Sequence, residues 1–451
     1  MNFMAILNGL FGLAVLIGIA FLFSNNKKRI NWRLVVSGFG LQLVFAVIVL
    51  KGNALAAYFS PLGWPKILFE WISRFFVLLL GFTTAGAKFV FGNLAVGPGN
   101  DQSLGVFFAF QVLPTIIFFA SLMSILYHLG VMQRIVQAMA WVMARVMGTS
   151  GAESLSNTAN IFVGQTEAPL MIKPYLKGMT QSELLTIMVG GMATIAGGVM
   201  AAYVQMLGYS YAEVHGLQIT EAQVMFAAQL LGASIMAAPA GMAMAKIIYP
   251  EVEEPETKGV VRVKVEKTAS NVIEAAAAGA SEGLQLALNV AAMLLAFIAL
   301  IALSNYALEA LGDVTGLNET VRAQYGQPLT LQLLFGLLLQ YLAIAIGIPA
   351  QDALNIGSLL GTKVVLNEFV AYLDFSTMIA QNKIVTEKAI TMGTFALCGF
   401  ANFSSIAIQI GGITPLAPAR RKDLAKLGLR AVLGGTLANL MTATIAGILL
   451  G

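Results

Sequence analysis

Three short polar stretches interrupt this otherwise apolar chain and could bind a solute. They are NIFVGQTEAPLMIKP (160–174), GTKVVLNEFVAY (361–372) and GFANFSSI (399–406). Their carboxylate, amide and hydroxyl groups belong to Gln165, Thr166, Glu167, Asn367, Glu368, Asn402, Ser404 and Ser405. Such groups can accept hydrogen bonds from a polyhydroxylated solute, and the amides and hydroxyls can also donate. Because so many specific groups converge, the set suits a neutral polar solute with sugar hydroxyls better than a bulk ion.

The composition predicts a membrane protein. Hydrophobic types make up 58% of the 451 residues and charged types only 11%, whereas soluble domains carry roughly 25% charged residues. The long uncharged runs exclude a β-barrel, whose strands are short and alternate in polarity. We therefore predict an all-α polytopic membrane protein.

Few residues are suited to catalysis or to binding a transition metal. The sequence has two histidines, His128 and His215, and one cysteine, Cys398. They offer no nucleophile–base pair and no metal cluster, so we do not expect an enzyme. Cys398 is expected to be a small buried hydrophobic residue. The net charge of +4 fits basic loops that orient membrane helices and does not indicate nucleic-acid binding.

Basic loops predict how the chain crosses the membrane. Residues 1–26 carry no charged side chain and are long enough to span, which indicates a retained helix rather than a cleaved signal. Basic clusters follow this first span and precede the last one: Lys27, Lys28, Arg29, Arg33, Arg420, Arg421, Lys422, Lys426 and Arg430. Such clusters favour the cytoplasmic side. Both termini should then lie outside the cytoplasm, with an even number of full crossings.

Two further segments are expected outside the spans. Residues 131–147 carry two arginines on an otherwise apolar helix, which is typical of an amphipathic helix lying in the membrane interface. Residues 249–268 are rich in charge and are expected to form a solvated cytoplasmic connector.

The polar clusters occur in the same order twice. AESLSNTANIFVGQTE (152–167) and QDALNIGSLLGTKVVLNE (351–368) both begin with an acid and end in a polar residue and a glutamate. Each is followed by an interrupted apolar span and then by one more span, which is typical of transporters built from repeats. Two apolar segments precede each repeat. If all four segments crossed the membrane, the chain would have ten crossings and the two repeats would face the same way. If one segment of each pair lay laterally, the chain would have eight crossings and the repeats would enter from opposite sides.

Each repeat is predicted to form a re-entrant hairpin. Thr166 is a candidate N-cap and Pro169 suits the first turn of a helix, so a short helix should begin near Thr166 or Glu167. Asn367 is the corresponding cap before Glu368. Neither hairpin arm is long enough to cross the membrane. Irregular backbone inside a membrane must be buried in protein or must face a water-filled cavity. The alternative for both tips is a loop in the headgroup region.

The span after each hairpin is expected to be broken. Gly197 and Gly198 weaken the middle of one span, where freed carbonyls and the Thr194 hydroxyl could bind Na+; close helix packing is the alternative. In the other span, Asn402 and Ser405 could bind the solute or bond between helices. Phe400 could stack on a planar ring, although core or lipid contact is the commoner role of a phenylalanine.

The three motifs resemble those of the concentrative nucleoside transporter family. The matching residues are NIFVGQTEAPLMIKPYL (160–176), GTKVVLNEFVAY (361–372) and CGFANFSSIAIQIGG (398–412). The resemblance covers nearly the whole chain and points to the short bacterial form. It implies a homotrimer in a bacterial inner membrane, each subunit with eight transmembrane helices and two re-entrant hairpins in an inverted repeat.

The resemblance also implies a division of the chain into a fixed and a moving part. Residues 1–150, including 131–147, would be mainly scaffold, as would the helices that follow the cytoplasmic loop in 248–350. The first transport repeat would occupy 151–247 and the second 351–451. The transport part would move across the membrane as an elevator.

Roles for individual residues follow from the same resemblance. The nucleobase would face Gln165, Thr166, Glu167, Val199 and Phe400. The ribose hydroxyls would bond Glu368, Asn402 and Ser405. The coupling Na+ would bind the carbonyls of Asn160, Val163 and Ile195 and the hydroxyl of Thr194.

The expected function is Na+-coupled import of nucleosides such as uridine or adenosine, with membrane lipid around the protein. Asn160 and the GQTEAP motif favour Na+, and the alternatives are a proton-coupled symporter and a channel with re-entrant loops. Gly164 leaves room beside the expected base, so tolerance of both pyrimidine and purine nucleosides is predicted.

Overall fold

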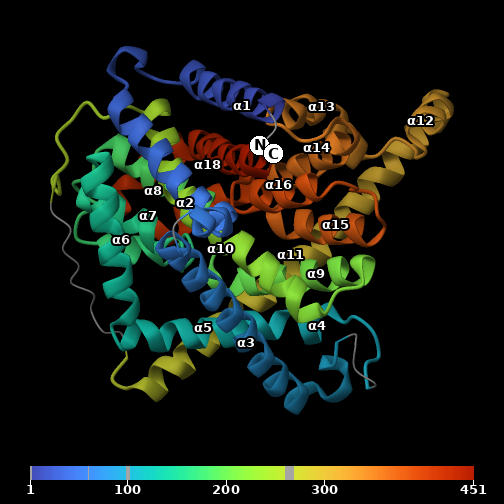
Figure 1. The fold of residues 1–451 in the computed structure, drawn as a ribbon, viewed down its shortest axis with the longest axis horizontal. Coiled ribbons are helices and arrows are strands. Elements are labelled where there is room, and N and C mark those ends of the chain that lie inside the picture. Colours follow the sequence, from blue (N-terminus) through green and yellow to red (C-terminus); the bar gives the residue numbers. More distant parts are fainter. Residues whose placement is uncertain (1–2, 59, 98–101, 260–268, 451) are drawn as a thin grey trace.

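The chain folds into helices throughout the part that the computed structural model describes (Figure 1). Those residues contain no β-strand and only an isolated bridge between Ser150 and Lys258. The all-α prediction is therefore confirmed. Residues 260–268 of the predicted connector lie outside the described residues. The described ranges are 3–58, 60–97, 102–259 and 269–450.

Eight helical stretches of the described chain are long and apolar enough to cross a bilayer. This number agrees with the predicted eight. The stretches are Ala5–Leu22, Trp32–Gly52, Trp64–Ala95, Phe108–His128, Gln181–His215, Ile219–Ile248, Val272–Val314 and Pro418–Leu450. A further apolar pair, α13 (Leu331–Ala345) and α14 (Ala350–Val365), is bent by 120°. Gly347 adopts a positive φ and Pro349 lies immediately before α14, so the helix cannot continue through this corner.

The first repeat runs through a short helix, an irregular turn, a broken span and a long helix. Helix α6 (Val131–Met147) precedes the repeat. The elements of the repeat are α7 (Gly151–Ala159), η4 (Ala168–Ile172), α8 (Gln181–Ala193), α9 (Gly197–His215) and α10 (Ile219–Ile248). Helix α6 coincides with the predicted amphipathic segment. Only three residues, 194–196, separate α8 from α9.

The second repeat follows the same order. Its elements are α14, α15 (Glu368–Ala380), α16 (Glu387–Leu397), α17 (Phe403–Ile413), η5 (Pro418–Arg420) and α18 (Arg421–Leu450). Five residues, 398–402, separate α16 from α17. Both spans predicted to be broken are therefore broken. The unwound residues of the first are 194–196, whereas Gly197 and Gly198 open the next helix.

The start of each hairpin is hydrogen-bonded to the start of the broken span that follows it. In the first repeat the Ser150 hydroxyl donates to Glu183 at 2.5 Å. In the second, the backbone N–H groups of Val385 and Thr386 donate to Asp352 at 2.9 and 3.2 Å. These long-range bonds hold each hairpin against its own span, so the two form one packed unit.

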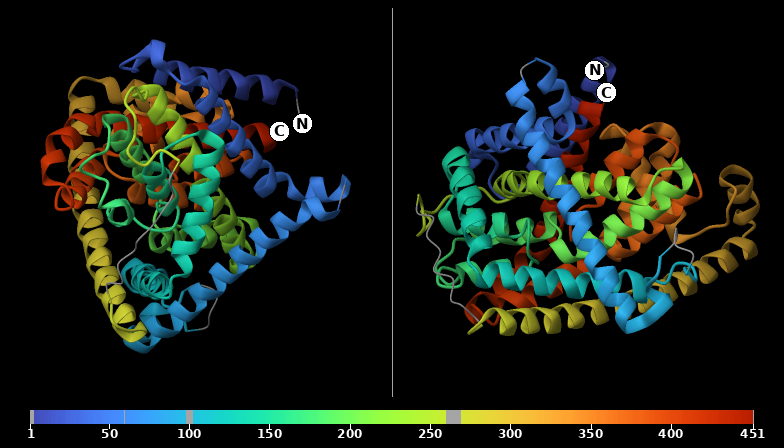
Figure 2. Two further views of the ribbon diagram at one scale, coloured as in Figure 1. Left: turned by 90° about the vertical axis from the view of Figure 1, so that its left-hand side faces the viewer. Right: turned by 60° about the horizontal axis from the view of Figure 1, so that its bottom comes forward.

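The broken and final spans form the core, and other helices surround them (Figure 2). In the most apolar windows of α8–α9 and α18, 83% of residues are buried, against 22% in α1 and in α11. Helix α11 packs along α5 at one side, and α12 projects from the body (Figure 1). The remaining helices are α1 (Phe3–Leu22), η1 (Lys27–Arg29), α2 (Trp32–Tyr58), η2 (Ser60–Gly63), α3 (Trp64–Phe91), η3 (Gly92–Ala95), α4 (Phe108–Gln111), α5 (Leu113–His128), α11 (Val272–Val314) and α12 (Leu317–Tyr325).

Candidate functional site

The first hairpin tip is an irregular turn rather than the start of an α-helix. After α7 the N–H groups of Glu167 and Ala168 both donate to the Gly164 carbonyl, at 3.2 and 3.1 Å. A five-residue 3-10 helix, η4, begins at Ala168 with Pro169 in its first turn. The expected Thr166 cap is wrong, because Glu167 occupies the cap position and its side chain makes no cap bond. Pro174 lacks an N–H and prevents an α-helix from continuing.

The second tip has the predicted helix cap. Asn367 caps α15, and its side-chain oxygen accepts a 2.9 Å hydrogen bond from the Val370 N–H. Glu368 is the first residue of that helix and is buried. Its carboxylate therefore lies at a helix N-terminus, where the backbone dipoles favour negative charge.

Glu368 is held by two donors from other elements. The Tyr203 hydroxyl of α9 donates to one carboxylate oxygen at 3.1 Å, and the Asn402 amide donates to the other at 2.9 Å. Asn402 in turn caps α17, since its oxygen accepts from the Ser405 N–H at 2.8 Å. The second tip, α9 and the break before α17 thus share one hydrogen-bonded set.

The set extends to the first tip through α17. The Gln165 amide donates to the Ser405 hydroxyl at 3.1 Å. Gln409 donates to the Gln165 side-chain oxygen at 3.0 Å and to the Met188 carbonyl at 2.9 Å. These residues form one network, which we call the polar bridge: Tyr203, Glu368, Asn402, Ser405, Gln165 and Gln409. Four of the six are predicted substrate residues. Tyr203 and Gln409 were not predicted.

The other predicted substrate residues are less tightly held. Val199 is buried in α9, and Phe400 is half-buried in the break before α17. Thr166 donates to the carboxylate of its neighbour Glu167 at 3.3 Å, and Glu167 is exposed. The Glu167 carboxylate folds back against Gly164. The room expected beside this glycine is therefore taken by Glu167 in this structure rather than left free for a base.

Several oxygen atoms that accept no hydrogen bond lie where the first tip meets the break between α8 and α9. The Gly197 N–H donates to the Phe162 carbonyl at 3.2 Å, which brings the two segments together. Within the described residues, the buried Asn160 side-chain oxygen has no partner, and the carbonyls of Asn160, Val163 and Ile195 accept no hydrogen bond. The Thr194 hydroxyl donates to Gly190 at 2.9 Å and so keeps its lone pairs for another group. Neutral oxygens are the ligands that a small hard cation prefers.

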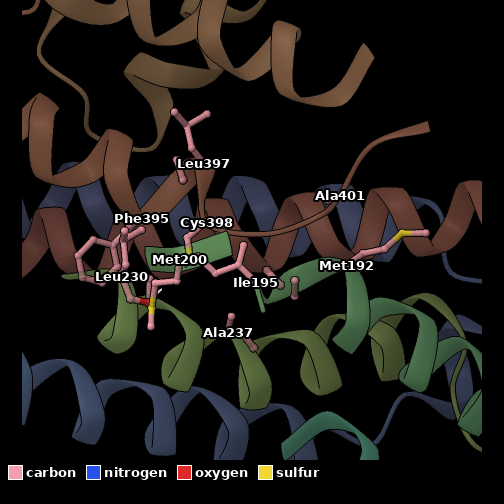
Figure 3. Packing of buried hydrophobic residues seen from close by; sticks show 14 of the residues in the cluster. Met192, Ile195, Met200, Leu230, Ala237, Phe395, Leu397, Cys398 and Ala401 are labelled. Atoms are coloured by element: carbon pink, nitrogen blue, oxygen red, sulfur yellow. Dashed lines mark hydrogen bonds between the residues drawn. The ribbon is translucent and has the colours of Figure 1, made fainter. Parts of the chain in front are cut away.

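Apolar residues cover the two breaks on the side of α10 (Figure 3). Ile195 from one break, with Met192 from the end of α8, and Cys398 and Ala401 from the other break are buried in one cluster that also includes Leu230. Cys398 is fully buried and free, as predicted. This packing excludes water from the unwound backbone, so its polar groups must find partners within the protein or in a bound solute or ion.

Three sequence families match consecutive parts of the chain. They are described as Na+ dependent nucleoside transporter N-terminus (residues 11–94), Nucleoside recognition (109–210) and Na+ dependent nucleoside transporter C-terminus (229–447). Together they cover most of the chain and include both hairpin tips and both breaks.

Relatives are similar along the full chain and are transporters rather than enzymes. The nucleoside permease NupC of Helicobacter pylori is 42% identical over 98% of this chain and 97% of its own. The sodium/nucleoside cotransporter 1 of Rattus norvegicus is 39% identical over 97% of this chain and 63% of its own. The solved structure of CNTnw in an inward-facing substrate-bound state matches with a TM-score of 0.84 at 40% identity, covering 99% of this chain and 100% of that one. CNTnw variants have also been solved in an outward-facing state.

Proposed function

The chain belongs to the family of Na+-dependent, concentrative nucleoside transporters, and we propose that it imports nucleosides by symport with Na+. The polar bridge carries this proposal. It joins both hairpin tips to a helix break and collects carboxylate, amide and hydroxyl groups in the core of a membrane protein. Ionisable groups at that depth are costly and are usually functional.

The proposed substrate orientation follows from which groups are already ordered. Glu368, Asn402 and Ser405 would bond the ribose hydroxyls, because they present an acceptor pair and donors held by a helix start. Gln165, Thr166, Glu167, Val199 and Phe400 would surround the base. Gln165 and Ser405 bond each other in this structure, so each would exchange that bond for one to the nucleoside.

Na+ would enter as a second substrate at the donor-free oxygens of Asn160, Val163, Thr194 and Ile195. The buried, unpartnered side-chain oxygen of Asn160 supports this assignment. Asn160 and Val163 of the ion site lie with Gln165 on the irregular turn after α7, so an ion that orders this turn would also fix Gln165. By linkage, the factor by which Na+ raises nucleoside affinity equals the factor by which nucleoside raises Na+ affinity.

We further propose that the two repeats, 151–247 and 351–451, move as an elevator against a scaffold of the remaining helices in a homotrimer. The contrast between buried spans of the repeats and exposed apolar helices such as α11 supports this division. A bacterial inner membrane with both termini outside the cytoplasm agrees with the basic loops at Lys27 and Arg420.

Uptake by purified protein in sealed liposomes tests the function. Labelled uridine and adenosine should accumulate above the outside concentration when a Na+ gradient is imposed without a pH gradient. Accumulation driven only by a pH gradient would show that protons, and not Na+, are the coupling ion. Equilibration without accumulation under either gradient would indicate a channel and overturn the proposal.

A further inference from the structure

A buried lysine in the second hairpin has no carboxylate partner. Lys363, near the end of α14, is 1% exposed. Among the described residues, no carboxylate lies within 4.0 Å of its ammonium. It donates instead to the Ala396 carbonyl at 3.0 Å and to the Asn439 side-chain oxygen at 2.8 Å. Glu368 interacts electrostatically with this ammonium but forms no direct ion pair with it. Burying a charge without a direct ion pair is costly, so this ammonium requires an explanation.

The lysine and its partner Asn439 face the ends of two half-helices. The Asn439 amide donates to the carbonyl of Ala193, the last residue of α8, and to that of Cys398, directly after α16. Helix C-termini carry unpaired carbonyls and a partial negative charge. Two such ends therefore converge on the ammonium of Lys363 and the amide of Asn439.

Close packing shows that this convergence is a built feature of the fold. Gly399 follows α16 with a φ of +152°, a conformation that favours glycine. A Cβ added there would lie 2.8 Å from the carbonyl oxygens of Met192 and Ala193 and would collide with Asn439. Only a glycine lets the break after α16 approach the end of α8 this closely.

The first repeat has a different arrangement at the corresponding place. Phe162 and Lys363 each lie five residues before the glutamate of their tip, and each contacts the neighbouring broken span. The Phe162 carbonyl accepts from Gly197, and the Lys363 ammonium donates to Ala396. Around Phe162 several oxygens lack hydrogen-bond donors, whereas around Lys363 an ammonium donates to one carbonyl and the amide of Asn439 donates to two others. Carbonyls and half-helix C-termini of this kind bind cations in transporters.

We propose that the Lys363 ammonium is a tethered cation that occupies the place of a bound ion in the second repeat. It would neutralise the ends of α8 and α16 and hold Asn439 between them, so that this repeat needs no ion from solution. The proposal concerns the second repeat alone and does not depend on Na+ being the coupling ion of the first.

Replacing the charge and then restoring it from solution tests this role. In choline buffer without Na+, Lys363→Ala should lower the unfolding midpoint of the purified full-length protein by about 5 °C or more. Ethylammonium should restore at least half of the loss, because it can fill the vacated space with a cation. Ethanol at the same concentration should restore none. Lys383→Ala, which removes an exposed lysine after α15, should respond to neither compound.

A second variant separates the charge from the hydrogen bond. Lys363→Gln keeps a donor for Ala396 but has no charge, so its uridine uptake should fall about tenfold or more, while Lys363→Arg should retain more activity. Uptake by the glutamine variant within twofold of wild type would overturn the proposal. So would an alanine variant whose midpoint responds equally to ethylammonium and to ethanol. If the alanine variant does not fold, the glutamine variant decides, and if wild type takes up no uridine, the midpoints decide.

Discussion

The two hairpin tips carry the same acid in opposite states. Glu368 is 6% exposed, begins an α-helix and is held by Tyr203 and Asn402 from two other elements. Glu167 is exposed, lies before a short 3-10 helix and accepts hydrogen bonds from its neighbour Thr166 and from the backbone of its own turn. The second tip is therefore fixed by tertiary contacts, whereas the first is shaped mostly by its own turn.

This difference suggests separate duties for the two halves of the site. A preorganised group binds more tightly, because little ordering cost remains when the ligand arrives. The Glu368 side is ready to recognise hydroxyl groups in this structure. The Glu167 side is the half that an ion or a substrate could still reorganise, which fits a coupling ion bound beside the same turn.

The largest effect is expected for Glu368→Gln. Tyr203 and Asn402 both donate to this carboxylate, and a glutamine would present an amide NH2 to one of them. A buried donor without an acceptor and the loss of a charged hydrogen bond each cost about 1.5–3 kcal/mol. Uridine affinity in uptake competition should therefore fall tenfold or more.

An internal control shows whether the loss concerns the ribose. Uridine and its 2′-deoxy and 3′-deoxy analogues should be compared in wild type and Glu368→Gln. The analogue that lacks the bonded hydroxyl should lose less affinity than uridine does. Equal losses for all three nucleosides would contradict a ribose contact and leave Glu368 with a structural role.

The next largest effect is expected for Tyr203→Phe. The substitution keeps the ring, which stacks on Tyr372 with centroids 4.2 Å apart, and removes one donor to Glu368. A net hydrogen bond to a charged group is worth about 1.5 kcal/mol or more, which predicts a loss of about tenfold in nucleoside affinity. Tyr211→Phe on the same helix is the matched control, since its hydroxyl donates to the exposed Glu387. Similar losses in both variants would show that α9 tolerates no such change and would remove Tyr203 from the site.

Thr194→Ala should have a smaller effect, confined to the ion. The change removes one of four proposed oxygen ligands and leaves the polar bridge intact, so the Na+ half-saturation of uptake should rise about threefold to fivefold. Uridine affinity at saturating Na+ should stay close to that of wild type. Thr186→Ala is the control, because Thr186 makes the same kind of bond within α8, to Ser182. An unchanged Na+ half-saturation in Thr194→Ala would argue against the ion site.

Local signals in the sequence predicted most of the fold. The apolar runs, the order of the repeated features and the broken spans all follow from composition, glycines and caps. The Asn367 cap was correct because an asparagine before a helix satisfies a nearby N–H without help from other elements. The Thr166 cap was wrong because Pro169 and Pro174 together restrict the turn to a 3-10 helix, a balance that one residue type does not reveal.

Tertiary contacts in the site were harder to predict. Gln409 could have been suspected, since a glutamine in an apolar span needs partners. Tyr203 gave no such signal, because a tyrosine suits an apolar helix and only the packing of α9 against the second tip brings it to Glu368. Lys363 was visible as a lysine before the tip, but its position at two helix ends depends on Asn439, 76 residues further along.

The smallest effect is expected for Glu167→Gln. This variant tests most directly whether the two tips differ in order. The Glu167 side chain is exposed, and the hydrogen bonds that it accepts come from Thr166 and from backbone N–H groups of its own turn, which a glutamine oxygen can accept as well. A group that water can solvate leaves no buried donor unpaired when it loses its charge. Nucleoside affinity should therefore fall by about threefold or less, measured beside Glu368→Gln in the same liposomes. A loss of tenfold or more would mean that substrate or ion closes the first tip around Glu167, so that the looser tip of this structure becomes as ordered as the second when loaded. Repeating the measurement at low and at saturating Na+ would then show which of the two orders it, because a tip closed by the ion should show the larger loss at saturating Na+.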